Sequence, residues 1–174
     1  MNKNFKELLP HVKAFAFDID GVLSKQTQPM SAEGVPMRTA NIKDGYVLQL
    51  AIKLGFKIAI ITGGRQEAIR KRYEGLGITD VFMGQSTKLG TYEQWRDQNG
   101  LTDDQILYMG DDMPDLPVLQ KVGVPVCPAD ACPDVKQICR YISPIIGGEG
   151  CVRDVVEQVI RAHNLWGSDH ACSW

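Results

Sequence analysis

Two aspartates one residue apart follow an apolar run near the start of the chain. Asp18 and Asp20 come directly after Val12–Phe17, and Gly21 follows them. Carboxylates this close repel each other, so the pair needs a metal ion to neutralise it, or a division of labour between a nucleophile and an acid. A single pattern of this kind also occurs in solvated turns and in the metal sites of other folds. Its meaning therefore depends on what the rest of the chain brings to the same place.

Three later segments could supply partners for this pair: a hydroxyl in a permissive turn, an ammonium group and further carboxylates. They are Thr62-Gly63-Gly64, Lys88, and Gly110-Asp111-Asp112 with Asp115. Taken singly, Thr62 could be a helix cap, Lys88 a surface charge and the aspartates a solvated turn. A calcium loop beginning at Asp18 is excluded, because its twelfth residue is Pro29 rather than glutamate. The order of all four segments favours one shared site over coincidence.

The elements that must position these residues alternate between strand and helix patterns. The predicted strands are Val12–Phe17, Ile58–Ile61, Val81–Met83, Ile106–Met109, Val124–Cys127 and Tyr141–Ile142. Between them, apolar residues recur with helical period, as in 47–54 and 152–160. The alternation predicts an α/β fold with a Rossmann-like parallel sheet flanked by helices on both faces. Since the carboxyl ends of parallel strands share one edge, we expect the candidate residues to meet there.

The remaining features set the organisation and the setting of the chain. Its length of 174 residues predicts a single domain over 1–174, with a protruding β-hairpin near 22–41 and a polar, aromatic tail at about 165–174. A net charge of −2 offers no basic field for nucleic acid or for an anionic membrane. No apolar run is long enough to span a bilayer, and the polar start does not suit a signal peptide, so a cytoplasmic location is expected. The five cysteines have no regular spacing and are expected to be free thiols, with Cys172 exposed.

Together the four segments resemble the motifs of the haloacid dehalogenase superfamily of phosphotransferases. The resemblance implies that Asp18 is the nucleophile that forms an aspartyl-phosphate, and that Asp20 is the general acid and base. It implies that Thr62 and Lys88 bind the phosphoryl oxygens. Mg²⁺ would be held by Asp18, by Asp111 and by the backbone carbonyl of Asp20. Asp112 and Asp115 would orient these ligands.

Spacing places the chain in the capless branch of that superfamily. Only 25 residues separate Thr62 from Lys88, and the 41 residues between Asp20 and Thr62 already contain a helix and a strand. No cap domain fits in either interval, so the site is expected to be open in a monomer. An open site either takes a macromolecule, such as a phosphoprotein, or borrows a lid from another subunit.

Within this branch the chain closely resembles the 3-deoxy-D-manno-octulosonate 8-phosphate phosphatases from about residue 10 to 163. The segments that carry the resemblance are 41–45, 76–78, 84–89, 110–112 and 147–153. It implies Mg²⁺-dependent hydrolysis of that sugar-acid phosphate in lipopolysaccharide precursor synthesis. It also implies a homotetramer in which the hairpins form a central barrel and close neighbouring sites, with the C-terminal tail expected to help.

Several residues are candidates for contacts to the sugar acid. The resemblance implies Asn41, Lys43 and Asp44, besides Asp20, Lys88 and the loop Gly63-Gly64-Arg65. Asn41 and Lys43 could instead form an exposed turn, and Asp44 a helix N-cap, which we favour for Asp44. Family members commonly carry an arginine after the Thr-Gly of the second motif, where this chain has Gly64 and then Arg65.

Two other functions stay open at this point. The shifted arginine leaves room for a phosphatase of a nine-carbon acid 9-phosphate, of the 2-keto-3-deoxynononate or sialic acid type. A non-catalytic tetramerisation module is the alternative from another class. The intact Asp18, Asp20, Thr62, Lys88 and Asp111 argue against the module.

Overall fold

The computed structural model describes residues 4–172. Its centre is a six-stranded parallel sheet in the order β3-β2-β1-β4-β5-β6. The strands are β1 Ala14–Phe17, β2 Lys57–Ile61, β3 Asp80–Phe82, β4 Ile106–Met109, β5 Val124–Cys127 and β6 Tyr141–Ile142. The strand β1 lies in the middle and pairs with β2 on one side and with β4 on the other. The change of direction in strand order occurs at β1, where open α/β sheets place their sites.

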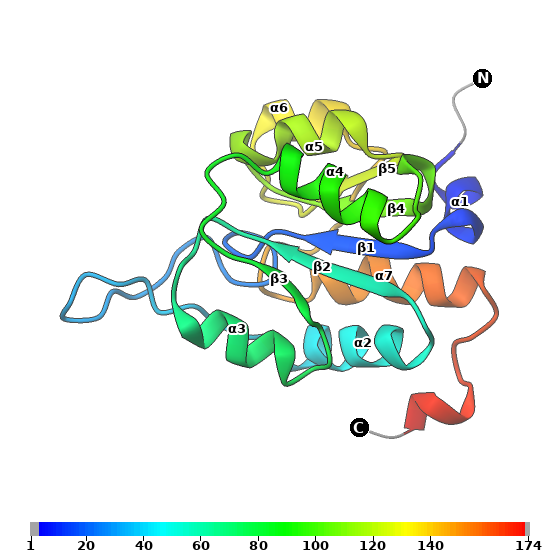
Figure 1. Cartoon of the computed structure of the whole chain (residues 1–174), viewed down its shortest axis with the longest axis horizontal. Helices are drawn as coiled ribbons and strands as arrows, with labels where there is room; N and C mark the ends of the chain where they lie inside the picture. The colour runs from blue at the N-terminus through cyan, green and yellow to red at the C-terminus, as the bar shows by residue number, and fades with distance from the viewer. Residues whose placement is uncertain (1–3, 173–174) are drawn as a thin grey trace.

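Helices cover both faces of the sheet (Figure 1). On one face lie α1 Phe5–Leu8, α2 Ile42–Lys53, α3 Glu67–Glu74 and α7 Cys151–Ala162; on the other lie α4 Leu89–Gln98, α5 Leu116–Lys121 and α6 Pro133–Ile138. Short 3₁₀ turns occupy Leu9–His11, Asp103–Gln105, Met113–Asp115 and Asp169–Cys172. Because side chains alternate along a strand, Phe15 and Phe17 pack with α2 and α7, whereas Ala14 and Ala16 pack with the helices opposite.

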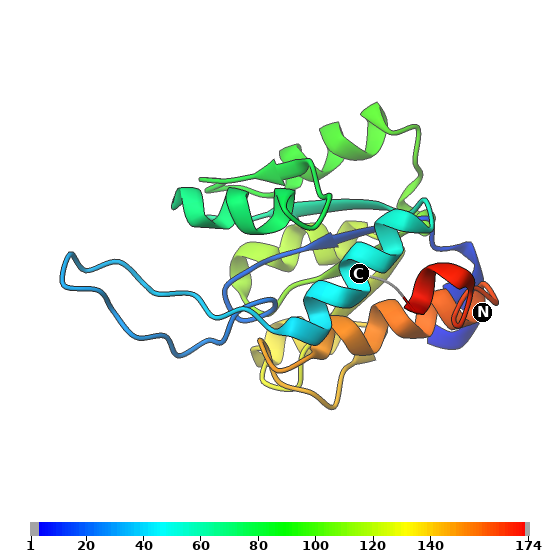
Figure 2. The ribbon, with the colours of Figure 1, turned by 90° about the horizontal axis from the view of Figure 1, so that it is seen from below.

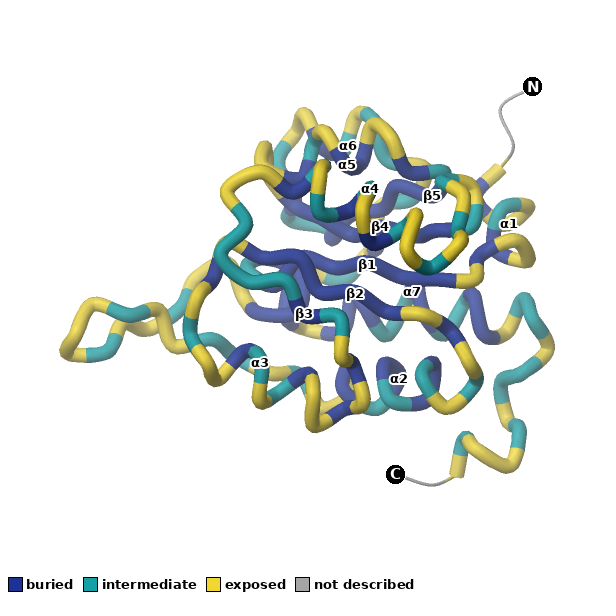
Figure 3. Tube along the Cα trace, in the orientation of Figure 1, coloured by how far each residue is buried: buried dark blue, intermediate teal, exposed yellow. Residues whose placement is uncertain are grey.

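The predicted fold class is confirmed, and strand boundaries differ by at most two residues. The central strands are buried on both faces (Figure 3), which explains why they are continuous apolar runs. The first strand begins at Ala14, since the Val12 N–H closes the preceding 3₁₀ turn onto the Leu9 carbonyl. Among residues 4–172, no helix is both long enough and apolar enough to cross a membrane.

The predicted hairpin is a long loop, which we call the arm (residues 25–40), that projects from the carboxyl edge of the sheet (Figures 1 and 2). Backbone pairing is confined to its tip, where Met30 bridges Pro36 and the Ser31 N–H donates to the Val35 carbonyl at 2.9 Å. The Met37 N–H donates to the Pro29 carbonyl at 2.8 Å, and at the base of the arm the Lys25 N–H donates to the Thr39 hydroxyl at 3.1 Å. Residues 22–24, at the start of the predicted hairpin, are buried in the body of the protein.

The described part of the C-terminal tail packs on its own chain. The Trp166 ring lies between two guanidinium groups, 4.7 Å from Arg153 and 4.8 Å from Arg161, and the Tyr46 hydroxyl donates to the Ala171 carbonyl. In Figure 1 this segment lies at the end of the molecule away from the arm. Residues 173 and 174 lie outside the described part, and Cys172 is an exposed free thiol, as predicted.

Asp44 caps a helix, but not the one that begins beside it. The N-cap of α2 is Asn41, whose side-chain oxygen accepts the Lys43 and Asp44 N–H groups. Asp44 reaches instead to α7, where its Oδ1 accepts the Arg153 N–H at 2.7 Å. The α7 N-cap is Gly150, which has no side chain to do this. This buried carboxylate therefore joins the first turns of two neighbouring helices (Figure 2).

Replacing Asp44 with asparagine should change how stability depends on pH. Burial raises the pKa of Asp44 to about 6, although the Arg153 N–H and guanidinium oppose the shift. A folded-state pKa above the unfolded value contributes stability at low pH that is lost as pH rises through 6. We expect Asp44→Asn to gain on the wild type between pH 4.5 and 7.5, by at most about 3 kcal/mol. Urea unfolding measures this difference, with exposed Asp134→Asn as control; a pH-independent difference would contradict the burial argument.

Candidate active site

The first aspartate pair lies at the carboxyl end of β1, where the chain turns sharply. The Asp18 N–H donates to the Met109 carbonyl of β4 at 3.1 Å, which extends the pairing of β1 with β4 by one hydrogen bond. The Asp18 side chain is buried at the carboxyl edge of the sheet. Gly21 follows with φ +92°, and a Cβ there would lie 2.0 Å from Asp111 Oδ2. Only glycine allows the first and fourth segments to approach this closely.

Lys88, at the start of α4, joins two carboxylates from different loops. Its Nζ lies 2.7 Å from Asp18 Oδ1 and 2.7 Å from Asp115 Oδ1. Asp115 is held further by the Tyr108 hydroxyl at 2.6 Å on Oδ1 and the Asp111 N–H at 3.1 Å on Oδ2. Burial acts to lower the pKa of Lys88, but Asp18 and Asp115 outweigh it and the pKa lies above its usual value. Lys88 is therefore a fixed ammonium charge.

One ammonium cannot neutralise the carboxylates around it. Oxygen atoms of Asp18, Asp111 and Asp115 lie within 4.8 Å of one another. Burial and then Asp115 raise the pKa of Asp18 to about 7 against the opposing effect of Lys88, while burial, Asp18 and Asp115 raise the pKa of Asp111 to about 8. Three ionised carboxylates and one ammonium leave two negative charges, which suits a divalent cation with oxygen ligands. Since Asp115 is occupied by Lys88, Tyr108 and the Asp111 N–H, the available carboxylate ligands are Asp18 and Asp111.

The Asp20 carboxylate faces the same space from the next turn, and two donors from the arm hold it. Gln28 Nε2 donates to Asp20 Oδ1 at 2.8 Å, and Arg38 donates to Oδ2 at 2.7 Å. Its side chain is 41% exposed, unlike the buried carboxylates beside it. Asp20 is thus oriented from outside the acidic cluster, in a position suited to proton transfer with a group bound near Asp18.

A cavity of about 400 Å³ opens over these residues, lined among others by Asp18, Asp20, Gly63, Ser86, Lys88 and Asp111. Thr62 follows the last residue of β2 and is buried, with its hydroxyl accepting the Gly64 N–H at 3.1 Å, and it does not itself line this cavity. The exposed Asp112 lines the rim. The geometry brings a nucleophilic carboxylate, a fixed cation and a separate acid or base together around a space of ligand size.

Known proteins share both this sequence and this fold. A family model described as haloacid dehalogenase-like hydrolase matches residues 75–150. The 3-deoxy-D-manno-octulosonate 8-phosphate phosphatase KdsC of Escherichia coli K12 is 34% identical over 152 residues, 87% of this chain and 81% of that protein. The chain belongs to this phosphatase family of the haloacid dehalogenase superfamily. It is accordingly a phosphoric monoester hydrolase.

Solved structures of the family agree with the architecture. A Moraxella catarrhalis phosphatase of the same name, solved with a magnesium ion, a phosphate ion and a KDO molecule, has a TM-score of 0.87 at 31% identity, covering 92% of each chain. A cobalt-bound Haemophilus influenzae relative has a TM-score of 0.88 at 26% identity, covering 94% of this chain and 98% of that one. Members of this family thus bind divalent metal ions.

Several predicted substrate contacts lie outside the cavity around Asp18. Asn41 and Asp44 use their side chains as helix caps, and Asp44 is buried. Lys43 is exposed on the first turn of α2. Arg65 is exposed too, in an open hollow with Met83 and Gly84.

Three residues of the arm reach the phosphatase site although sequence reasoning missed them. Gln28 and Arg38 hold Asp20, and Gln26 Nε2 lies 3.4 Å from Asp111 Oδ2 and donates to the Asp130 carbonyl at 3.0 Å. These residues sit in a loop without periodicity. The only available signal was that long polar side chains occur in a segment that begins three residues after Val22.

The position of Arg38 depends on the space that Gly64 leaves. A Cβ at Gly64 would lie 2.9 Å from an Arg38 terminal nitrogen and 2.7 Å from Ile69 Cδ1. Gly64→Ala should therefore displace Arg38 from Asp20, and Arg38→Met should remove the contact outright. Because loss of orientation at an acid or base is costly, we expect both variants to lower kcat/KM for glycerol 2-phosphate, whose alkoxide leaving group needs a proton, by about ten- to a hundredfold. Gly90→Ala in open space on α4 is the control, and wild-type rates in both variants would contradict a positioning role for Arg38.

Proposed function

We propose that this protein is a Mg²⁺-dependent phosphatase that hydrolyses 3-deoxy-D-manno-octulosonate 8-phosphate, a step of lipopolysaccharide precursor synthesis. The observation that carries the reaction type is the buried Asp18–Lys88 contact beside Asp111 and Asp20. The substrate rests on relatives of that name, which cover most of this chain, and on the KDO molecule bound to one of them.

In the first step, Asp18 attacks phosphorus with its free carboxylate oxygen. A bond forms between this oxygen and phosphorus, the ester bond breaks, and Asp20 gives a proton to the departing alkoxide. Lys88 and the Thr62 hydroxyl donate hydrogen bonds to the phosphoryl oxygens, which offsets repulsion between an anionic nucleophile and an anionic substrate. The products of this step are the free sugar acid and an aspartyl-phosphate on Asp18.

In the second step, Asp20 takes a proton from a water molecule that attacks the same phosphorus. The bond from phosphorus to Asp18 breaks, which regenerates the carboxylate and releases inorganic phosphate. Mg²⁺, when bound by Asp18, Asp111 and the backbone carbonyl of Asp20, supplies positive charge to the phosphoryl group. Asp115 keeps Lys88 and the Asp111 loop in position throughout, and Asp112 contributes charge at the rim.

Selectivity for the sugar acid would come partly from other copies of the chain. The cavity around Asp18 is open, and exposed Lys43 and Arg65 are free to meet a ligand or a neighbouring subunit. Asn41 and Asp44 are structural in this proposal, because their side-chain oxygens cap α2 and α7. A nine-carbon acid 9-phosphate is the second candidate substrate, favoured only by the glycine at position 64.

A homotetramer built through the arm would complete this open site. The arm carries two large apolar side chains that a monomer leaves in water, Met30 at 67% exposure and Met37 at 49%. Its free backbone edges could pair with a second arm. Sedimentation at micromolar concentration should give the mass of four 19.3 kDa chains, and Met30→Asp with Met37→Asp should weaken the assembly. A wild-type monomer would contradict this arrangement.

The decisive experiment measures phosphate release from a panel of phosphate esters. We expect the highest kcat/KM for 3-deoxy-D-manno-octulosonate 8-phosphate, above the nine-carbon acid 9-phosphates and phosphoserine. Activity should disappear in EDTA, return with Mg²⁺, and fall at least about a thousandfold in Asp18→Asn, because no other group can form the phosphoenzyme. Thermal unfolding of Asp18→Asn checks that the variant is folded. A preference for phosphoserine, or turnover without any divalent metal, would overturn the assignment.

A further inference from the structure

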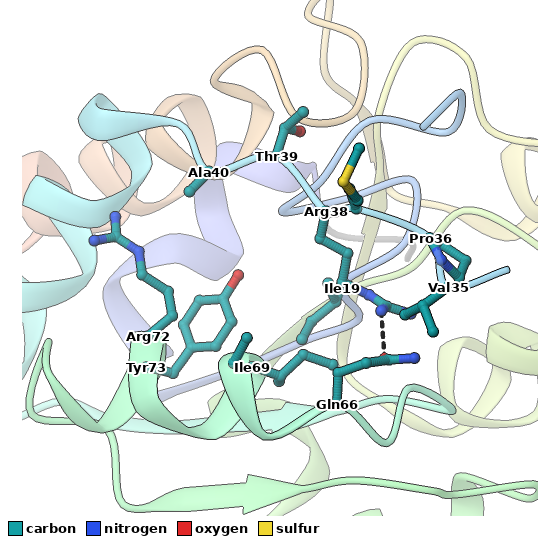
Figure 4. Close-up of a pocket in the computed structure, with 12 residues that line it drawn as sticks. Ile19, Val35, Pro36, Arg38, Thr39, Ala40, Gln66, Ile69, Arg72 and Tyr73 are labelled. Carbon is teal, nitrogen blue, oxygen red and sulfur yellow. Dashed lines mark hydrogen bonds between the residues drawn. The ribbon is translucent and has the colours of Figure 1, made fainter. Parts of the chain in front are cut away.

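Asp20 and Lys88 are held in place by different parts of the chain. The arm holds Asp20 through Arg38, which also donates to Gln66, the N-cap residue of α3 (Figure 4). Lys88 is held from within the protein, because its Nζ lies 2.7 Å from Asp115 Oδ1 and both side chains are buried. Whatever fixes the Asp115 carboxylate therefore also fixes the ammonium group of the site.

A tyrosine of the central sheet supplies one of the contacts that fix Asp115. Tyr108 is the third residue of β4 and is fully buried, and its hydroxyl donates to Asp115 Oδ1 at 2.6 Å. Burial and then the charge of Asp115 raise the pKa of Tyr108 well above its usual value, so the hydroxyl keeps its proton and donates. Lys88 Nζ and the Tyr108 hydroxyl thus share one oxygen of Asp115, while the other oxygen accepts the Asp111 N–H at 3.1 Å.

Loss of this hydroxyl would change the pull that Asp115 exerts on Lys88. Among residues 4–172, Lys88 would then be the only hydrogen-bond donor to Asp115 Oδ1. The hydroxyl comes from the packed interior, since Tyr108 is fully buried and does not line the cavity around Asp18. A carboxylate that loses a neutral donor attracts its remaining cation more strongly. Because Lys88 also contacts Asp18, this pull would draw the ammonium group away from the nucleophile.

We propose that Tyr108 is a positioning residue for phosphoryl transfer, which acts through Asp115 to aim Lys88 at the phosphoryl group. An ammonium group has three N–H donors, and Asp18 and Asp115 take two of those of Lys88. The third is left for a phosphoryl oxygen, so a small rotation or displacement of the ammonium group spoils its aim. This inference rests on the proposed function, because it needs Lys88 as a donor to the phosphoryl group, but it does not depend on which sugar acid is the substrate.

Tyr92 provides a matched control for Tyr108. It is also fully buried, and its ring packs edge-on against the Tyr108 ring, with the centroids 6.5 Å apart. Its hydroxyl donates at 2.8 Å to Asp103, in the 3₁₀ turn that precedes β4 and so lies at the other end of that strand from the site. Tyr92→Phe and Tyr108→Phe therefore each remove one hydroxyl from the same buried aromatic pair, but only Tyr108→Phe removes a contact to the site.

The test measures binding of orthovanadate, which adopts the five-coordinate geometry of a phosphoryl group in transfer. Calorimetry in the presence of Mg²⁺ should give a dissociation constant about tenfold higher in Tyr108→Phe than in the wild type, and within about twofold of the wild type in Tyr92→Phe. The value of kcat for p-nitrophenyl phosphate, whose leaving group needs no proton from Asp20, should fall by a similar factor in Tyr108→Phe alone. A dissociation constant does not change with the fraction of protein that is folded, so a loss of stability cannot produce this difference. Unchanged vanadate binding in Tyr108→Phe would overturn the proposal.

Two further variants establish whether the hydroxyl acts through Asp115. Tyr108→4-aminophenylalanine restores an N–H donor of similar reach, and it should bring the vanadate dissociation constant back to within about threefold of the wild type. In an Asp115→Asn background, which already weakens the attraction to Lys88, Tyr108→Phe should have little further effect, because residues that act in one chain of contacts are not additive. An undiminished effect of Tyr108→Phe in that background would contradict a role through Asp115.

The outcomes separate this inference from the proposed substrate. If the wild type does not hydrolyse 3-deoxy-D-manno-octulosonate 8-phosphate but Tyr108→Phe still weakens vanadate binding, the substrate assignment fails and the positioning role stands. If the 8-phosphate is the best substrate but Tyr108→Phe binds vanadate as tightly as the wild type, the positioning role fails alone. Thermal unfolding establishes that each variant is folded before its binding is compared.

Discussion

One buried ammonium group, Lys88 Nζ, holds the catalytic edge of the sheet together. It contacts Asp18 at the end of β1 and Asp115 at the start of α5, and Lys88 itself is the N-cap residue of α4. Ions taken out of water lose several kcal/mol of hydration each, and only close partners recover this free energy. These two contacts therefore fix the positions of three segments relative to one another: the loop after β1, the start of α4 and the start of α5. A lysine without both carboxylates, or the carboxylates without the lysine, would be far costlier to bury.

The same arrangement leaves the site short of positive charge. Lys88 balances one carboxylate, and burial together with mutual repulsion raises the pKa values of Asp18 and Asp111 toward neutrality. A structure selected only for stability would replace such a cluster with apolar side chains. An acidic cluster of this kind is useful where a divalent cation binds, because the carboxylates hold the cation and the cation in turn offsets the charge of a phosphoryl group. Local instability is thus tied to the chemistry, while the apolar strands behind it supply the stability of the fold.

Sequence reasoning succeeded where local pattern and strand order determine position. The six strands and their parallel arrangement follow from short apolar runs separated by helices, and strand ends then bring Asp18, Thr62, Lys88 and Asp111 to one edge. It failed where a contact depends on the path of a loop or on a distant element. Asp44 was expected to cap its own helix, but its partner is 109 positions away in α7. Gln28 and Arg38 could not be placed either, because nothing in the arm's sequence indicates how its two sides return to the body.

The arm shows how a capless fold can supply what a cap domain would otherwise provide. Gln28 and Arg38 of the arm donate hydrogen bonds to Asp20, so a segment outside the sheet orients the carboxylate that we propose as acid and base. The Arg38 guanidinium passes close to the backbone of Gly64 on its way to Asp20. Gly64 leaves the space for it, because a side chain there would collide with Arg38 and Ile69. The glycine at position 64 therefore has a structural consequence. It allows a cation from the arm to approach the same region, while Arg65 turns to an open hollow beside Gly84. The arm also carries the exposed Met30 and Met37, so in the proposed tetramer one segment of the chain would serve both assembly and the orientation of Asp20.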